Sequence, residues 1–225
     1  MTTILVTKDN IYCDTRCTSS SEITSDDFIK FFPLSNGAIA IGAGSVQDII
    51  GALAIFEGHG EKNRIEDIVR VNRTKIIIVH PDGFIEMFRT TNRPPGSSAR
   101  PQPSNNTPTL FWTGTEPFET FGSGSIHVKA HMEYVDKEPL NAMKNAARKD
   151  SATSNRVFVI PRRWVDGELK VKFHDGLTAN GKHRKAVEAA VDFPENTDWV
   201  YEALTGQRDL HSPELVQTTV RRGNK

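Results

Sequence analysis

The sequence has no long apolar run. Apolar stretches such as Ile76–Val79 have the length of a strand, whereas a membrane-spanning helix needs about 20 predominantly apolar residues. The N-terminal segment also lacks the early positive charge and the continuous apolar core of an export signal. We therefore expect no membrane as a partner, and a cytoplasmic location.

Neither sign of charge is in excess. The chain of 225 residues carries 28 basic and 28 acidic side chains, so its formal net charge at pH 7 is zero. A chain without net charge has no overall long-range attraction to polyanions. We therefore expect no nucleic acid among its partners.

Cysteine is scarce, with Cys13 and Cys17 alone in the chain. A disulfide framework needs more cysteines and an oxidising compartment, so both are expected to be reduced thiols. His127 and His131 lie one helical turn apart but lack the glutamate of an HExxH zinc helix, and two imidazoles do not fill a coordination sphere. The sequence therefore predicts no metal site and no cofactor.

Three hairpins are predicted from β-rich runs that flank short turns. They span residues 2–14, 74–88 and 156–175. The second turns at Pro81-Asp82-Gly83 and the third at Asp166-Gly167. A further apolar strand, of the kind that is covered on both faces, is predicted over residues 38–44.

Apolar residues at helical spacing predict helices between these strands. The expected helices span residues 45–56, 64–71, 125–135 and 139–149, and weaker helical patterns follow at 185–191 and 197–204. Proline at position 139 suits the first turn of its helix. This order predicts an α+β fold in which helices cover the outer faces of two antiparallel sheets.

The composition divides the chain into one domain and an extension. We expect a domain over residues 1–175, with an inserted loop at about 90–109 that is rich in Pro, Ser, Asn and Gly. A loop of this length is unusual inside a compact domain and suggests a function. Residues 176–225 are predominantly polar and are expected to form a C-terminal extension.

The N-terminus offers a catalytic group. If Met1 is removed, Thr2 carries both a hydroxyl and a free α-amine, and a pKa of about 7.7–8.0 leaves a useful fraction of such an amine uncharged at neutral pH. Thr2 would then supply nucleophile and general base from one residue. Taken alone, a threonine here is more often the simple start of a strand.

Six short motifs strengthen the catalytic interpretation. TTILV, CDTR, IK before an apolar strand, GAGS, GSGS and ARKDSATS follow one another along the chain. Together they resemble the β-type subunits of proteasomes and the bacterial peptidase HslV, which are N-terminal-nucleophile hydrolases. The resemblance covers roughly residues 2–175 and implies a four-layer αββα sandwich of two antiparallel sheets.

The resemblance also implies a role for each matching residue. Thr2 would be the nucleophile, and the Lys30 ammonium beside it would lower the pKa of the α-amine. Asp14 would pair with Lys30 and keep it charged. Gly44, where a strand turns into a helix, would offer its backbone N–H to the oxyanion.

Further matching residues surround this group. Ser123 and Asp150 would complete the network around the amine, with Thr153 where the family usually has a serine. Gly42 and Val46 would line a roomy, uncharged pocket for a substrate side chain. The sequence departs from the family in a short first hairpin, a reduced helix near 65–71, the inserted loop and the tail.

The implied function is that of a threonine-type endopeptidase, which cleaves peptide bonds through an acyl-enzyme ester. Its partners would be a peptide or unfolded-protein substrate, further copies in a homo-oligomeric ring and, by analogy, an ATP-dependent unfoldase. Two alternatives stay open. One is an amidohydrolase of the same chemistry that acts on a small amide, and the other is a non-catalytic shell or scaffold subunit with the same fold.

Overall fold

The computed structural model describes residues 2–19, 22–26, 28–60, 68, 74–88, 109–111, 117–174, 176, 186–199 and 220–222. Met1 lies outside these residues, as do nearly all of the helix expected over 64–71 and of the inserted loop expected at about 90–109. Within the described ranges the chain forms helices and antiparallel strands.

Seven of the described strands form one antiparallel sheet, called the large sheet below. It begins with the predicted N-terminal hairpin, in which Ile4 lies opposite Cys13. Its strands are β1 (Thr3–Thr7), β2 (Asn10–Asp14), β10 (Phe118–Gly122), β11 (Val157–Pro161), β12 (Lys170–His174), β13 (Val187–Val191) and β14 (Val220–Arg222). Their order is β10-β1-β2-β11-β12-β13-β14, which places the start of β1 between β2 and β10.

Five more strands form a second antiparallel sheet, called the small sheet. In spatial order they are β5 (Phe31–Pro33), β6 (Ile39–Ala43), β7 (Lys75–Val79), β8 (Ile85–Phe88) and β9 (Thr109–Phe111). The pairing of β7 with β8 confirms the predicted second hairpin. A separate pair, β3 (Cys17–Ser19) and β4 (Glu22–Ser25), forms the β3–β4 hairpin.

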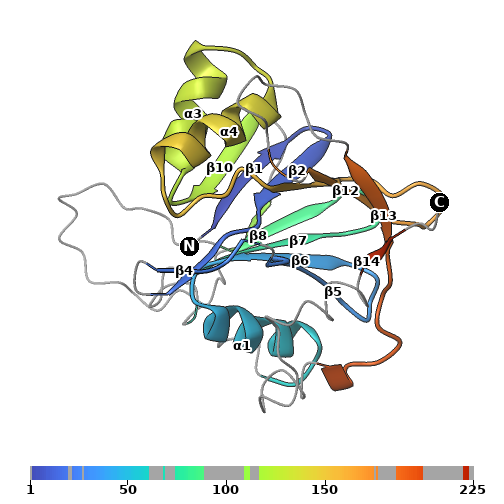
Figure 1. Ribbon diagram of the computed structural model, residues 1–225. Helices are drawn as coiled ribbons and strands as arrows, with labels where there is room; N and C mark the ends of the chain where they lie inside the picture. The colour runs from blue at the N-terminus through green and yellow to red at the C-terminus, as the bar shows by residue number, and fades with distance from the viewer. Residues whose placement is uncertain are drawn as a thin grey trace, which may run out of the picture.

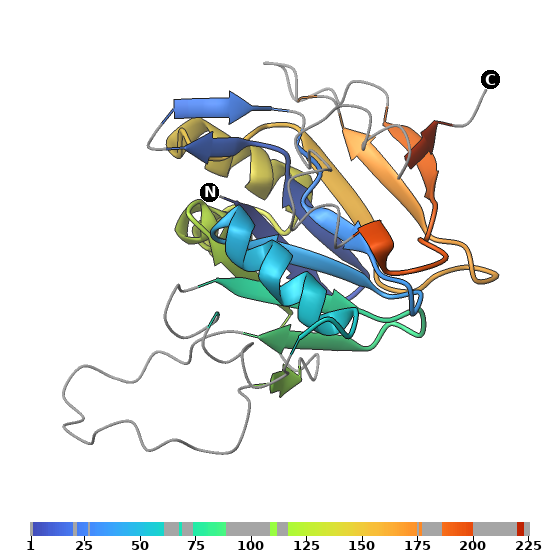
Figure 2. The same ribbon diagram turned by 90° about the horizontal axis from the view of Figure 1, so that it is seen from below.

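The helices lie on the outer faces of the two sheets. They are α1 (Val46–Phe56), α3 (Ser125–Tyr134) and α4 (Pro139–Lys149), each inside a predicted span. Figure 1 shows α3 and α4 over the large sheet and α1 under the small sheet, and Figure 2 shows α1 in front when the molecule is seen from below. The structure is therefore a mixture of helices and antiparallel sheets, as predicted. Of the helices in the described ranges, none is long and apolar enough to cross a membrane.

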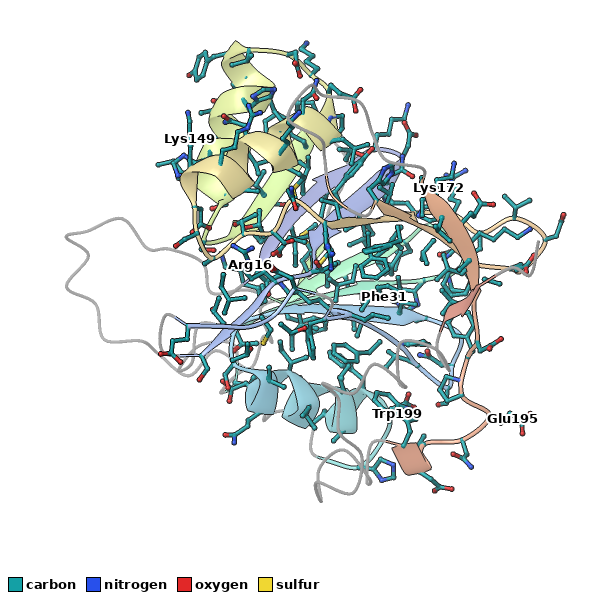
Figure 3. The ribbon with its side chains drawn as sticks, in the orientation of Figure 1. Arg16, Phe31, Lys149, Lys172, Glu195 and Trp199 are labelled. Atoms are coloured by element: carbon teal, nitrogen blue, oxygen red, sulfur yellow. The ribbon has the colours of Figure 1, made fainter. Side chains whose placement is uncertain are left out.

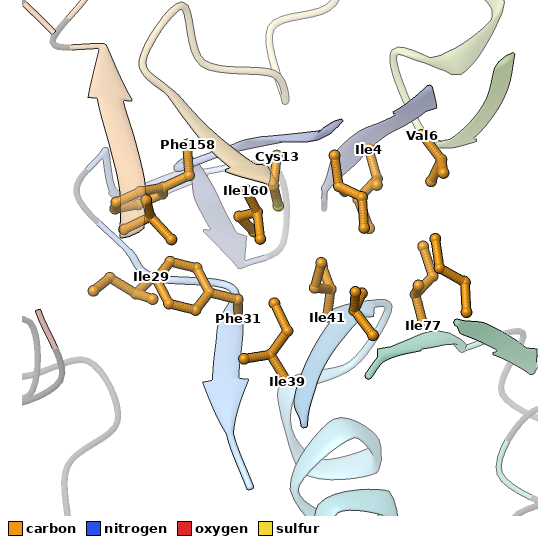
Figure 4. Packing of buried hydrophobic residues seen from close by; sticks show 14 of the residues in the cluster. Ile4, Val6, Cys13, Ile29, Phe31, Ile39, Ile41, Ile77, Phe158 and Ile160 are labelled. Atoms are coloured by element: carbon orange, nitrogen blue, oxygen red, sulfur yellow. The ribbon is translucent and has the colours of Figure 1, made fainter. Parts of the chain in front are cut away.

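The main core fills the space between the two sheets. Ile4, Cys13 and Phe158 point from the large sheet toward Phe31 and Ile41 of the small sheet (Figure 4). The rings of Phe31 and Phe158 meet edge to face with their centroids 5.3 Å apart. Each fully buried side chain of this size stabilises the fold by about 1.5–3 kcal/mol, so the core fixes the sheets against each other and with them the ends of β1, β2 and β6.

The helix expected over 185–191 is wrong, because Val187–Val191 forms β13. Its residues alternate as in a strand: Ala189 and Val191 are buried, whereas Glu188 is exposed. Ala and Glu are good helix formers, but helix propensity is worth less than about 1 kcal/mol per residue, and the edge of β12 supplies a ladder of backbone partners along Val187–Ala190. The tertiary context therefore overrides the local propensity.

The segment after residue 175 also contacts the body of the protein. β13 and β14 extend the large sheet, so the predicted boundary at 175 falls between two neighbouring strands of one sheet. Farther along, Trp199 is 9% exposed and packs in the cluster between α1 and the small sheet (Figure 3). Of the helical pattern expected over 197–204, the structure describes the first three residues.

Candidate active site

Thr2 is held in place directly before β1. It is 6% exposed, and its carbonyl oxygen accepts a hydrogen bond from the Ser123 N–H at 3.2 Å. The same carbonyl lies against Gly122, whose φ is +92°, and a Cβ at position 122 would overlap the Thr2 carbonyl oxygen. Glycine is therefore required at 122, both by its backbone conformation and by the close approach of Thr2.

A buried ion pair lies beside this strand. Asp14 ends β2 and is 0% exposed, and Lys30 precedes β5 and is 4% exposed. Lys30 Nζ donates to Asp14 Oδ1 at 2.7 Å, and the Thr3 N–H donates to the same oxygen at 2.7 Å. The second oxygen accepts the backbone N–H groups of Arg16 and Ser154 at 3.1 and 3.0 Å. Four donors thus compensate the desolvation of one carboxylate.

The second threonine of the chain belongs to a different network. The Thr3 hydroxyl oxygen accepts the Gly124 N–H at 3.0 Å and lies 2.6 Å from Thr153 Oγ1. The Thr153 hydroxyl donates to Asp150 Oδ2 at 2.6 Å. Because the Thr153 proton is used there, Thr3 is the donor to Thr153. The Thr3 hydroxyl is therefore committed to a chain of hydrogen bonds that ends on Asp150.

Asp150 is the charged end of this chain. Burial raises the pKa of its carboxyl, but the Thr153 hydroxyl, the nearby Ser123 hydroxyl and the Ala152 N–H outweigh burial and hold that pKa below its usual range. The Ser123 Oγ is buried and makes no hydrogen bond of ordinary geometry with the described residues, but it lies near enough to Asp150 to lower the pKa of that carboxyl. The Ser123 hydroxyl therefore lies between the backbone of Thr2, which the Ser123 N–H bonds, and the Asp150 network.

The turn between β6 and α1 faces the same region. Gly44 has a φ of +151°, and a Cβ there would lie 2.5 Å from Thr74 Oγ1. Ser45 follows as the N-cap of α1 in an extended conformation, and its side chain makes no capping hydrogen bond. The first N–H groups of a helix carry partial positive charge, so this turn favours a negatively charged oxygen.

A cavity of about 620 Å³ opens between these elements. Of the residues predicted from the sequence, those that line it are Thr2, Lys30, Gly42, Gly44 and Val46. The other three predicted residues do not line the cavity but bond to residues at or next to it. Asp14 bonds Lys30, the Ser123 N–H bonds the Thr2 carbonyl oxygen, and Asp150 is linked to Thr3 through Thr153. The structure thus brings the predicted residues into one neighbourhood, in which Thr2 and not Thr3 faces the cavity.

Arg16 is a member of this neighbourhood that was not predicted. Its guanidinium binds Asp26 through two bonds of 2.6 and 3.0 Å, and it donates to the Ser151 carbonyl oxygen at 2.6 Å. The Arg16 guanidinium lowers the pKa of the Asp26 carboxyl. Arg16 (Figure 3) therefore joins the end of the β3–β4 hairpin, one wall of the cavity, to the loop that carries Asp150. The signal was present in the sequence, because CDTR places this arginine two residues after Asp14.

The described part of the chain holds further His, Cys, Asp and Glu side chains outside this neighbourhood. Across the described ranges, no group of three or more His, Cys, Asp or Glu side chains is arranged to hold a metal ion. His131 bonds Asp136 instead, at 3.1 Å. The two cysteines are free thiols, Cys13 buried and Cys17 half-buried, as expected from the sequence.

Among solved structures, the chain is similar to eukaryotic HslV from Trypanosoma brucei. The alignment covers 70% of this chain and 97% of that chain, with 16% identity and a TM-score of 0.45. No family model matches the chain. No curated protein matches it either.

Proposed function

We propose that this chain is a threonine-type endopeptidase, an N-terminal-nucleophile hydrolase in which Thr2 becomes the nucleophile once Met1 is removed. The observation that carries the proposal is that Thr2 and Lys30 line the same cavity, with the lysine fixed by the buried Asp14. The layer order of α3 and α4, large sheet, small sheet and α1 supports the αββα sandwich of this class (Figure 1).

The proposed reaction begins with the removal of a proton from Thr2. A second positive charge next to the Lys30 ammonium is disfavoured, so the α-amine of Thr2 is held neutral and accepts the proton of its own hydroxyl, directly or through a water. We assign the Ser123 hydroxyl to bond that amine, because the backbone N–H of Ser123 bonds the Thr2 carbonyl oxygen at 3.2 Å. Asp14 keeps Lys30 charged and oriented through its 2.7 Å bond.

The hydroxyl oxygen then attacks the carbonyl carbon of the substrate. Negative charge develops on the carbonyl oxygen, where the Gly44 N–H and the start of α1 stabilise it. The protonated amine gives its proton to the leaving nitrogen as the C–N bond breaks, which leaves an ester on Thr2. Water hydrolyses the ester, with the amine again as general base.

The proposal extends to assembly. Three large apolar side chains of the outer helical layer are exposed to solvent. Ile126 and Tyr134 of α3 are 70% and 83% exposed, and Val135, directly after the helix, is 72% exposed. The proposal assigns these side chains to contacts between copies in a homo-oligomeric ring that is built through the helical layers. Unfolded proteins as substrates and an ATP-dependent unfoldase as a partner are parts of the same proposal.

The experiment compares Thr2→Ala with Thr7→Ala, a threonine at the other end of β1, in chains whose intact mass shows that Met1 is gone. Cleavage of fluorogenic peptides should fall by about a thousandfold or more in Thr2→Ala and stay unchanged in Thr7→Ala. Thr2-dependent hydrolysis of small amides without peptide cleavage would show the amidohydrolase instead. No Thr2-dependent turnover of either substrate would show a non-catalytic subunit.

A further inference from the structure

A buried hydroxyl lies behind the turn between β6 and α1. Ala43 of β6 lies opposite Lys75 of β7. The same register places Thr74, which is 0% exposed, opposite Gly44. A Cβ at position 44 would lie 2.5 Å from Thr74 Oγ1 and 3.0 Å from both Cα and Cβ of Thr74. Thr74 therefore packs against the side of Gly44 on which another residue would carry its side chain.

The same hydroxyl also reaches α1. Thr74 Oγ1 donates to Asp48 Oδ2 at 3.3 Å, and Asp48 is the acidic residue in the first turn of α1. This distance is longer than that of most O–H···O bonds, so the bond adds to the packing against Gly44 and does not replace it. Thr74 thus contacts both ends of the short segment that leads from the strand into the helix.

The segment between these two contacts faces the cavity. Gly44 and Ser45 are exposed and are among the residues that line it. A glycine has no side chain with which to hold the turn, and the Ser45 side chain makes no capping hydrogen bond. Thr74 therefore gives this exposed turn a buried side-chain support from the side away from the cavity.

We infer that Thr74 is a positioning residue for the oxyanion, which aims the Gly44 N–H through its packing against Gly44 and its bond to Asp48. This inference rests on the proposed peptidase function, because it assumes that negative charge develops next to Gly44. Thr74 is not among the residues that line the cavity, so it acts through the backbone and not on the substrate. An oxyanion donor stabilises the transition state only when it points at the place where the charge develops.

The first test removes the hydroxyl and keeps the branched shape, in Thr74→Val. For a fluorogenic peptide, kcat should fall by about tenfold to a hundredfold. KM should stay unchanged, because the oxyanion exists in the transition state and not in the bound substrate. Thr74→Ser keeps the hydroxyl and should restore most of kcat. Thr7→Val is the matched control, since the Thr7 hydroxyl donates to the Asn10 carbonyl oxygen at 2.8 Å, at the far end of β1.

A peptide aldehyde gives a second readout that depends on the oxyanion itself. Thr2 Oγ bonds the aldehyde carbon, the former carbonyl oxygen takes the electron pair of the C=O bond, and the hydroxyl proton moves to the α-amine. In Thr74→Val the inhibition constant of the aldehyde should rise by the factor by which kcat/KM falls, because the adduct resembles the transition state. The inhibition constant of the corresponding peptide alcohol, which forms no such bond, should stay unchanged.

Asp48 provides the test if Thr74→Val does not fold, because Asp48 is half-buried. Asp48→Ala removes the acceptor and should lower kcat, whereas Asp48→Asn keeps an accepting oxygen and should retain it. The double variant of Thr74→Val and Asp48→Ala should be no slower than Thr74→Val alone, because side chains that act as one unit do not give additive losses.

The outcomes separate this inference from the proposed function. Thr2-dependent cleavage with wild-type kcat in Thr74→Val, or in Asp48→Ala, overturns the inference alone. A loss of kcat that Thr74→Ser does not restore, an equal loss in Thr7→Val, or equal weakening of the aldehyde and the alcohol also overturns it. Absence of any Thr2-dependent cleavage by wild-type protein overturns the proposed function, and the inference with it.

Discussion

Gly122→Ala tests whether the position of the Thr2 backbone controls activity. Two costs arise at this residue. A non-glycine residue at a φ of +92° costs about 1–2 kcal/mol. The new Cβ also overlaps the Thr2 carbonyl oxygen and lies 2.6 Å from its carbon, so Thr2 must move by on the order of 1 Å, a displacement that costs about a hundredfold in rate. We therefore expect kcat to fall by about a hundredfold and the free energy of unfolding to fall by about 2–5 kcal/mol.

Gly37→Ala separates the two costs. Gly37 has a φ of +82°, and a Cβ there would have no atom within 4 Å. This variant should lose the same 1–2 kcal/mol of backbone strain, or about 2–4 °C of melting temperature per kcal/mol for a domain of this size, and keep wild-type kcat. Peptide hydrolysis well below the melting temperature and scanning calorimetry measure both effects. Wild-type kcat in Gly122→Ala, or an equal loss in Gly37→Ala, would refute the reasoning.

Three further perturbations test other parts of the site. Asp14→Asn leaves a buried ammonium without its carboxylate, so urea unfolding should show a loss of about 3–5 kcal/mol; a loss below about 1 kcal/mol would contradict the burial argument. Arg16 lowers the pKa of Asp26, so this carboxylate contributes stability above its unfolded pKa that is lost as pH falls through the lower folded pKa. In Arg16→Ala the melting temperature should therefore fall less steeply as the pH is lowered, and an unaltered dependence of melting temperature on pH would contradict this role. Burial raises the pKa of the Cys13 thiol to about 12. The buried neutral thiol therefore contributes to the stability of the fold below its unfolded pKa, and this contribution is lost as pH rises toward 12. Iodoacetamide at pH 8 should modify Cys17 in the folded chain and Cys13 only after unfolding; early modification of Cys13, followed by mass spectrometry, would contradict its burial.

Local sequence signals account for most of the elements in the described ranges. The first hairpin follows from alternation on either side of a polar turn, and α4 begins at Pro139, where proline suits the first turn. β13 was missed because its residues carry no strong strand signal of their own. The edge of β12 decides its structure, and that edge exists only once the sheet has formed.

The site was predictable to the extent that its residues lie in short motifs. Thr2, Lys30 and Gly44 each belong to such a motif, and the fold places all three on one cavity. The contact between Thr74 and Gly44 was not predictable, because it depends on how β7 pairs with β6. The commitment of Thr3 to the Asp150 network likewise depends on Thr153, which lies 150 residues away along the chain.

The central claim is that Thr2 acts through a hydroxyl and an α-amine of the same residue. A peptide with an α′,β′-epoxyketone needs both groups, because the hydroxyl adds to the ketone and the amine opens the epoxide. Peptide mapping by mass spectrometry after treatment should find a stable adduct on the peptide that begins at Thr2, and none in a variant with a blocking residue before Thr2. Labelling of that blocked variant, labelling at Cys13 or Ser123, or no labelling of a chain shown to begin at Thr2 would contradict the account.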